Sequence, residues 1–312
     1  MEGWGEVEFA FDESEYTHAA SLLDGMLRAP GDHLVEIVVV ASRALRALSR
    51  YPEALHLLSF ARANQRARAR VGVESGEIAW ITHDYDYAAQ AAREALTCGH
   101  KLERARVLFA RAERPFLNRN ELGPAGHGHV FTHAALYVDK GGNFGDIALP
   151  IAVREAIESQ APVQCWQPLH VHQLVEERTL ERINQSTALL IGGGGLFLPD
   201  TSPNANSGCQ WNIPLDAIDR IQVPIGLFAV GFNLFRGQEF RGGLFQRSLE
   251  AMVGRASLVG LRNHGSVSRV QGMLPPRLAD KIRFLPRPTT ILSHIHPAAP
   301  SCRCRPTTLG PY

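Results

Sequence analysis

The chain has 312 residues, of which 45% are hydrophobic and 20% are charged, a balance typical of a soluble globular protein with about two domains. Because the formal net charge is only +1, neither nucleic acid nor an anionic membrane surface is expected as a partner. The acidic N-terminus has no apolar core, and no apolar run reaches ~18 residues, so we expect neither a signal peptide nor a membrane span.

The cysteines indicate a reducing compartment. They are odd in number and scattered along the chain, at Cys98, Cys165, Cys209, Cys302 and Cys304. Such usage argues against a disulfide framework, and we expect a cytoplasmic protein. Cys302 and Cys304 form a C-x-C pair, but no second pair completes a zinc site. We therefore expect no metal and no cofactor.

Residues 16–114 are predicted to form a helical region. Helices are expected over 34–48 and 53–63, and the residues that follow show the spacing of buried helical stripes. The first stripe consists of Ala88, Ala91, Ala92, Ala95 and Leu96, and the second of Leu102, Ala105, Phe109 and Ala112. Four arginines crowd one short segment, namely Arg62, Arg66, Arg68 and Arg70. We interpret them as a solvated helix face rather than a binding patch.

A weak internal repeat runs through this region. The segments Tyr51 to Ala54 and Tyr85 to Ala88 lie 34 positions apart, and the small or apolar residues after them align at the same offset. Since 34 residues is the period of tetratricopeptide repeats, the region resembles a short tetratricopeptide-like array. Such an array presents a concave surface, so a protein partner is expected. A plain helical bundle is the alternative.

The second half of the chain predicts an α/β fold. Residues 115–130 are rich in proline and glycine and are predicted to be a linker, and residues 131–295 to be a Rossmann-like domain. Strands are expected over 134–138, 162–166, 188–191, 224–230 and 257–261, and helices over 147–158, 173–184, part of 212–221, and 243–253. This alternation is typical of a parallel sheet covered by helices on both faces, which binds ligands at the carboxyl ends of its strands.

The first strand end with unusual residues is the turn Gly141-Gly142-Asn143-Phe144-Gly145-Asp146. It lies between a strand and a helix, and the free N–H groups of the helix's first turn favour an anion there. Its spacing is not G-x-G-x-x-G, so a dinucleotide site has little support. The alternative is a tight turn without a ligand, in which Asp146 caps the helix.

A second strand end carries four consecutive glycines: Gly192, Gly193, Gly194 and Gly195. Because such a run costs much backbone entropy, a loop that a ligand approaches closely explains it better than structure alone. The polar stretch after it, around Asn204, offers hydroxyls and amides that suit a sugar, with a solvated surface loop as the alternative. Trp211 is either a stacking platform for a sugar ring or a core residue.

A third strand end reads Arg262-Asn263-His264-Gly265-Ser266. The planar guanidinium of Arg262 suits a carboxylate or a phosphate. His264 is a candidate for proton transfer near neutral pH. The alternative is a salt-bridged arginine beside an exposed histidine.

Together these motifs resemble the polysaccharide pyruvyl transferase family. Gly-Gly-Asn-Phe-Gly-Asp, Ile-Gly-Gly-Gly-Gly-Leu, Gly231-Phe232-Asn233 and the segment Arg262 to Ser266 match the family in order and spacing. The resemblance covers residues 134–288, and the helical half is similar to the family variant that carries tetratricopeptide-like repeats. It implies a GT-B-like architecture, in which two Rossmann-like halves enclose a cleft.

The resemblance also implies a reaction, the transfer of an enolpyruvyl group from phosphoenolpyruvate to a saccharide, which forms a pyruvate ketal. Such chemistry needs a base, an acid, and cations for the phosphate and carboxylate. The candidate catalytic residues are Asp146 as base or acceptor-binding carboxylate, Arg262 as the cation, and His264. The candidate substrate-binding residues are Gly141, Gly142, Asn143, Gly192, Gly193, Gly194, Gly195 and Asn204.

The chain departs from the family pattern at its end. A second Rossmann-like half is implied from about Pro288, but residues 296–312 have no hydrophobic period and are expected to be a disordered tail. We therefore expect a truncated or frame-shifted chain that performs little or no transfer. The alternative function is a tetratricopeptide-type interaction protein whose sheet domain binds a sugar without catalysis. A nucleotide-sugar glycosyltransferase shares the implied fold but not the Arg262 to Ser266 sequence.

Overall fold

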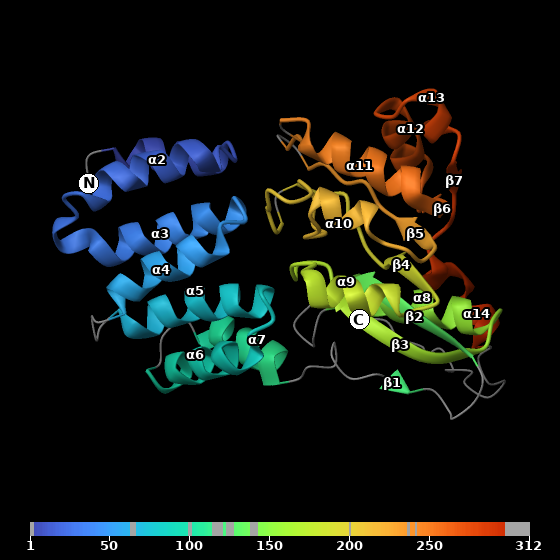
Figure 1. Ribbon diagram of the computed structural model, residues 1–312, viewed down its shortest axis with the longest axis horizontal. Helices are drawn as coiled ribbons and strands as arrows, with labels where there is room; N and C mark the ends of the chain where they lie inside the picture. Colours follow the sequence, from blue (N-terminus) through green and yellow to red (C-terminus); the bar gives the residue numbers. More distant parts are fainter. Residues whose placement is uncertain are drawn as a thin grey trace, which may run out of the picture.

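An N-terminal helical region precedes a domain built on a parallel sheet, as the computed structural model shows (Figure 1). The structure describes residues 3–62, 67–98, 102–113, 121–122, 128–137, 143–199, 201–235, 238–240 and 242–296. At this level the predicted α/β fold class is confirmed. The predictions on Arg66, Gly141, Gly142, Cys302, Cys304 and the tail after His296 lie outside the described residues.

The helical region is a stack of helices, seen on the left of Figure 1. The helices are α1 (Trp4–Asp12), α2 (Tyr16–Leu27), α3 (Leu34–Ala47), α4 (Tyr51–Ala61), α5 (Arg68–Ile81), α6 (Tyr85–Thr97) and α7 (Leu102–Glu113), with a 3-10 turn η1 (Gly31–His33). Successive helices pack on one another, and α5 also packs on α3 and α7. In the part of the chain that the structure describes, no helix has the length and apolar character needed to cross a bilayer.

Three turns between these helices share one backbone geometry. In each turn a residue other than glycine has a positive φ, of 57°, 57° and 65° along the chain, which ends the helix. The N–H of the next residue then donates to the carbonyl five positions earlier. The residues with positive φ are Ser14, Ser49 and His83, and each is followed two positions later by the tyrosine that begins the next helix, at Tyr16, Tyr51 and Tyr85. The repeat noticed for two segments is therefore a structural repeat of three units.

Small side chains let the paired helices approach closely. Ala19, Ala54 and Ala88, one in each repeat, are fully buried. Gly76 on α5 leaves no room for a side chain, because a Cβ there would lie 2.8 Å from Leu108 on α7. The helices of this region thus pack more tightly than larger residues at these positions would allow.

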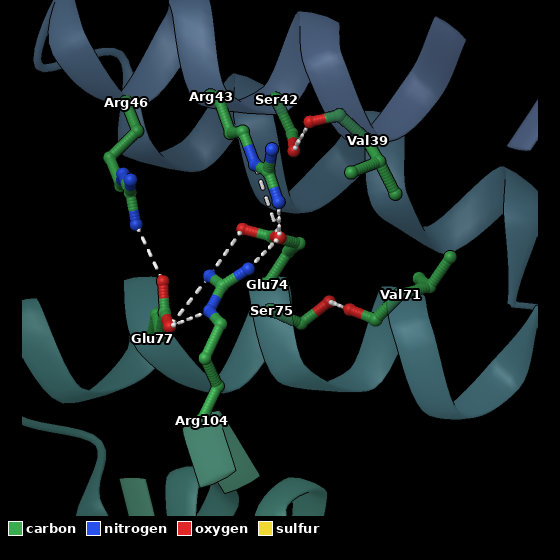
Figure 2. Close-up of polar contacts among 9 residues, drawn as sticks. All are labelled: Val39, Ser42, Arg43, Arg46, Val71, Glu74, Ser75, Glu77 and Arg104. Atoms are coloured by element: carbon green, nitrogen blue, oxygen red, sulfur yellow. Dashed lines mark hydrogen bonds and ion pairs between the residues drawn. The ribbon is translucent and has the colours of Figure 1, made fainter. Parts of the chain in front are cut away.

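A buried carboxylate ties three helices together (Figure 2). Glu74 on α5 is 2% exposed and accepts hydrogen bonds from Arg43 on α3 and from Arg104 on α7. Glu77, one turn later, accepts from Arg46 and from Arg104, both at 2.7 Å. Burial by itself would raise the pKa of Glu74, but the hydrogen bonds from both arginines outweigh it and lower the pKa to about 2. The network fixes α3, α5 and α7 relative to one another.

The described arginines of the crowded segment carry ion pairs within the helical region. Arg62 and Arg68 each lie 3.6 Å from Glu94, and Arg70 lies 2.8 Å from Glu36. Their charges are therefore used between helices, which agrees with the interpretation that they are not a binding patch.

The sheet contains six parallel strands and a short antiparallel strand at one edge. The strands are β1 (Glu121–Leu122), β2 (His129–Ala135), β3 (Val163–His170), β4 (Ala188–Gly192), β5 (Ile225–Val230), β6 (Ala256–Leu261) and β7 (Ile282–Phe284). Their order is β1-β3-β2-β4-β5-β6-β7, and β1 pairs antiparallel with β3. In the centre of the sheet, Ala134 pairs with Leu169 on one side and with Ile191 on the other.

Helices flank this sheet in two groups. They are α8 (Phe144–Glu158), α9 (Glu177–Asn184), α10 (Leu215–Asp219), α11 (Leu244–Arg255), α12 (His264–Gly272), α13 (Pro276–Ala279), η2 (Pro288–Ile291) and α14 (Leu292–Ile295). Buried side chains of α9 to α13 join one large core cluster, whereas α8 packs on η2 and α14. Right-handed crossovers place α8 on the face of the sheet opposite to α9.

The structure moves several element boundaries. β2 begins at His129, inside the expected linker, and contains the polar but fully buried residues Thr132 and His133, which an apolar pattern does not reveal. β3 continues to His170, beyond the expected end, and α9 begins only at Glu177. The expected strands over 188–191, 224–230 and 257–261 match β4, β5 and β6 within one residue at each end.

The helical region contacts the sheet domain through the repeat turns. The Ser49 hydroxyl accepts a hydrogen bond from the N–H of Ala205 at 3.0 Å. In the next repeat, Nε2 of His83 donates to the carbonyl of Leu174 at 2.7 Å, and the N–H of Leu174 donates to the carbonyl of Ile81 at 3.0 Å. Two equivalent turns thus hold two loops that follow β4 and β3.

Candidate functional site

The strand order creates a topological switch point between β2 and β4. The chain leaves β2 for β3 on one side and later returns to β4 on the other, so the loops after β2 and β4 diverge. Ligands of parallel sheets bind in the crevice that opens at such a point. Both glycine-rich turns singled out in the sequence follow these two strands, although Gly141 and Gly142 lie outside the described residues.

The first turn enters α8 through an asparagine cap. Asn143 Oδ1 accepts a hydrogen bond from the N–H of Gly145 at 2.9 Å, so the interpretation of Asp146 as the cap is wrong. Asp146 lies in the first turn of α8 and is half-buried. Within the described residues its carboxylate forms no hydrogen bond or ion pair, so it is available to a ligand.

Arg262, directly after β6, lies at the carboxyl ends of three neighbouring strands. Its Nη2 donates to Asn233 Oδ1, in the loop after β5, at 3.0 Å. Two glycines make room for the guanidinium. A Cβ on Gly231 would lie 2.2 Å from Nε of Arg262, and a Cβ on Gly195 would lie 3.3 Å from Nη2. The ends of β4, β5 and β6 therefore form a cradle for one cation.

A second arginine and a carboxylate act on this guanidinium. Burial lowers the pKa of Arg262, the positive charge of Arg287 lowers it further, and the negative charge of Asp146 raises it. Arg287 follows β7 at the start of η2. Two cations and one carboxylate leave an excess of positive charge, which suits a phosphate or a carboxylate ligand. Sequence reasoning missed Arg287 because β7 has only three residues and its end was not recognised.

Protein packing accounts for three of the four consecutive glycines. A Cβ on Gly192 would lie 2.3 Å from the carbonyl oxygen of Phe228 on β5. Gly193 has a φ of 85° and lies against Pro150 of α8. A Cβ on Gly195 would lie 2.2 Å from Nδ2 of Asn233. Structural use, set aside in the sequence argument, therefore explains these three positions. Around Gly194 the space is open apart from an ordinary contact at 3.5 Å, so a close ligand there stays a prediction.

The polar loop after the glycines is bonded to itself. Asn204 is 7% exposed, its Oδ1 accepts from the N–H groups of Asn206 and Ser207, and its Nδ2 donates to the carbonyl of Cys209 at 2.6 Å. The Asn204 amide thus shapes the loop, and the geometry gives no support to its assignment as a substrate-binding residue. Trp211 is 1% exposed in the main core, so it is a core residue and not a stacking platform.

His264 lies on the rim, at the start of α12. Its exposed ring stacks on Phe284 at the end of β7, with ring centroids 4.4 Å apart. Asn263 caps α12 by accepting from the N–H of Ser266 at 2.7 Å, and the Ser266 hydroxyl accepts from the N–H of Phe232 at 3.0 Å. Within the described residues, no contact joins His264 to Asp146 or Arg262, so its catalytic role stays a prediction.

Gln210 and His172 form a polar pair that contacts the second glycine turn. Gln210 Nε2 donates to the carbonyl of Gly195 at 3.2 Å, and Gln210 Oε1 lies 3.0 Å from Nε2 of His172. Burial lowers the pKa of His172 to about 4, so its ring is neutral and donates from Nε2 to Gln210. Neither residue belongs to a sequence motif, and only the fold brings them together.

A scan against protein-family models found no match, and neither did searches of curated proteins and of solved structures. Among the described residues, no group of three or more His, Cys, Asp or Glu side chains could hold a metal ion. The charged groups that interact at the carboxyl edge of the sheet are Asp146, Arg262 and Arg287.

Proposed function

We propose that this chain is a polysaccharide pyruvyl transferase-type protein whose sheet edge binds phosphoenolpyruvate and a saccharide. The observation that carries the proposal is the grouping of Arg262, Arg287 and Asp146 at the end of the sheet. Phosphoenolpyruvate bears a phosphate and a carboxylate, so it offers one anionic group to each arginine. Asp146 then lies beside the bound donor, and its carboxylate forms no hydrogen bond or ion pair with another described residue.

In the proposed reaction one saccharide hydroxyl adds to C2 of phosphoenolpyruvate, and a second hydroxyl replaces the phosphate. Of the two hydroxyl protons, one ends on C3, which becomes a methyl group, and the other leaves with the phosphate. Asp146 accepts the proton of an attacking hydroxyl. Arg262 and Arg287 stabilise the negative charge on the carboxylate and on the departing phosphate. His264 stays the candidate for the acid.

We also propose finer assignments for the two regions. The turns that recur after 35 and 34 residues support a tetratricopeptide-like array for the helical region. The parallel sheet with its switch point supports one Rossmann-like half of a GT-B-like fold. A cytoplasmic location is supported by Cys98 and Cys209, which form no disulfide among the described residues.

Titration calorimetry with phosphoenolpyruvate at low salt tests the donor site. Arg262→Gln and Arg287→Gln each remove a charge-assisted hydrogen bond, and we expect each to weaken binding about ten-fold or more. Arg269→Gln is the matched control, because this arginine is exposed on α12, away from the cradle. Undetectable binding by the wild type, or unchanged binding by both site variants, would contradict the proposal.

Phosphate release in the presence of saccharide acceptors tests the chemistry. Where the wild type releases phosphate at a measurable rate, Asp146→Asn is expected to lower that rate about 100-fold or more and to leave phosphoenolpyruvate affinity near normal, because the substitution removes only the proposed base. An unchanged rate would remove this assignment. Because little or no transfer is expected of this chain, binding of phosphoenolpyruvate without phosphate release is the expected outcome. Binding of a saccharide without any binding of phosphoenolpyruvate would favour the alternative function, namely an interaction protein with a non-catalytic sugar-binding domain.

A further inference from the structure

A pocket separate from the carboxyl-edge site lies where the helical region meets the sheet domain. It has a volume of about 510 Å³ and is formed by α9 on one side and by the turn between α5 and α6 on the other. Its walls include His83, Tyr85, Arg178, Thr179, Arg182 and Gln185. None of these residues belongs to the carboxyl-edge site, so the pocket calls for its own explanation.

Two arginines of α9 face this pocket. Arg178 and Arg182 are four positions apart, which places both side chains on one face of the helix. The Nε of Arg182 is buried and has no hydrogen-bond partner. Within the described residues, neither arginine forms an ion pair. A buried guanidinium N–H without an acceptor is costly, and an anion in the pocket would satisfy it.

The wall on the helical side supplies no counter-ion. Gln173 Nε2 donates to the Tyr85 hydroxyl at 2.9 Å, and this hydroxyl lies 3.0 Å from Nδ1 of His83. His83 Nε2 in turn donates to the carbonyl of Leu174. This chain of hydrogen bonds fixes the wall, and burial lowers the pKa of His83, so the wall is neutral at neutral pH.

Two carboxylates also line the pocket beside the arginines. Glu176 precedes α9, and Glu181 is exposed on α9. The groups that act on the charge of Arg182 are Arg178 and Tyr85, and no carboxylate is among them. Glu176 and Glu181 can therefore serve as acceptors for hydroxyl groups while the arginines stay available.

We propose that this pocket binds a phosphate monoester that carries hydroxyl groups. Its phosphate lies between Arg178 and Arg182, and its hydroxyls face Glu176, Glu181 and Gln185. A phosphate dianion can accept hydrogen bonds from both guanidinium groups, including the unpartnered Nε of Arg182. A pocket of about 510 Å³ also holds a body of sugar size beyond the phosphate. Because both regions form the walls, the ligand contacts the helical region and the sheet domain together.

Equilibrium binding of glucose 1-phosphate, glucose and inorganic phosphate tests this site. All proteins carry Arg262→Gln, so that the proposed active site contributes little and the two sites are read separately. We expect the sugar phosphate to bind, inorganic phosphate to bind more weakly, and glucose not to bind. Arg182→Gln and Arg178→Gln each weaken sugar phosphate binding about ten-fold or more, and Arg277→Gln, an exposed arginine on α13, leaves it unchanged.

Three results would overturn the proposal. They are undetectable binding of both phosphate probes, equal affinity for glucose and glucose 1-phosphate, and unchanged affinity in both arginine variants. Arg178 is exposed, so Arg178→Gln is expected to fold and keeps the test valid if Arg182→Gln does not. Hydrogen exchange gives a further readout, because the bound sugar phosphate is expected to slow exchange over α9 and over the turn at His83.

Discussion

The side-chain amide of Asn212 donates to the hydroxyl of Tyr51 at 2.8 Å, across the boundary between the helical region and the sheet domain. In the next repeat the equivalent tyrosine, Tyr85, accepts from the amide of Gln173 at 2.9 Å. Two tyrosines 34 positions apart thus make the same contact with two different loops of the sheet domain. The repeat turns that connect the stacked helices therefore also form the contact surface for the sheet domain.

Removal of the Tyr51 hydroxyl is predicted to loosen this edge. Tyr51→Phe leaves the carbonyl of His172, 3.2 Å away, as the remaining acceptor for Nδ2 of Asn212 among the described residues. We expect a loss of about 0.5–1.5 kcal/mol in the free energy of unfolding, the usual contribution of one hydrogen bond. We also expect faster hydrogen exchange at the amides of the loop 204–213, measured by mass spectrometry.

Tyr87→Phe is the matched control for this change. Its hydroxyl accepts from Arg62 at 2.9 Å inside the helical region and has no role at the boundary. Its loss is expected to cost a similar amount of stability without any change in exchange at 204–213. Equal exchange in the two variants would show that Tyr51 does not dock the sheet domain.

Glu74→Gln is predicted to destabilise the helical region strongly. The substitution leaves Arg43 and Arg104 facing a neutral amide in a buried place (Figure 2). Removing one partner of a buried ion pair typically costs about 3–5 kcal/mol. We expect a loss of this size in urea denaturation followed by circular dichroism. The exposed pair of Glu53 and Arg50 provides the comparison, and Glu53→Gln should leave the denaturation midpoint almost unchanged. A similar small effect for both variants would refute the structural role of Glu74.

The apolar pattern of the sequence was sufficient for the centre of the sheet but not for its polar strands. β4 and β5 are runs of largely buried apolar residues, and β6 is apolar apart from Ser257, so the positions of all three follow from the sequence alone. β2 and β3 contain Thr132, His133 and His170, which are fully or almost fully buried. Tertiary packing, not local pattern, decides that these polar residues lie inside, so both strands were predicted too short.

The residues of the candidate site differ in the same way: some follow from local sequence, and others depend on tertiary structure. Arg262 was recognisable because it follows a strand of apolar residues, and the structure places it where that strand ends. Asn204 was misjudged because a polar loop residue can bond its own backbone or a ligand, and the composition is the same in both cases. Arg287 was missed because the contact between the ends of β6 and β7 depends on the order of strands in the sheet.

Acid is predicted to destabilise the protein through buried histidines. Burial lowers the pKa of His172 from 6.5 to about 4, and burial together with the charge of Arg154 lowers that of His133 to about 3. Below pH 6.5 these histidines are protonated in the unfolded chain but stay neutral in the folded protein. Stability that is present above pH 6.5 is therefore lost as the pH falls toward 4. For His172 alone the loss between pH 7 and pH 5 is about 2 kcal/mol.

Urea denaturation at pH 7 and at pH 5 measures this effect. His172→Gln should reduce the difference in unfolding free energy between the two pH values by about 2 kcal/mol. His56→Gln is the control, since His56 is exposed on α4, and it should leave the difference as in the wild type. If His172→Gln shows the full wild-type pH dependence, the histidine is not held neutral by the fold.

The last prediction concerns the space that Gly231 leaves for Arg262, and it uses a substitution that changes no charge. In Gly231→Ala the added Cβ would lie 2.2 Å from Nε and 2.5 Å from Cζ of Arg262, so the guanidinium must leave its place. The hydrogen bond to Asn233 Oδ1 would then be lost, and the cation would no longer face Arg287 and Asp146.

Gly231→Ala is therefore expected to weaken phosphoenolpyruvate binding about ten-fold or more, as Arg262→Gln does, although every charge is retained. Gly254→Ala makes the same chemical change where no atom lies within 4 Å of the new Cβ, and it should bind as the wild type does. Titration calorimetry compares the three proteins. Full affinity in Gly231→Ala would mean that the donor does not depend on the position of Arg262. The proposed site would then fail.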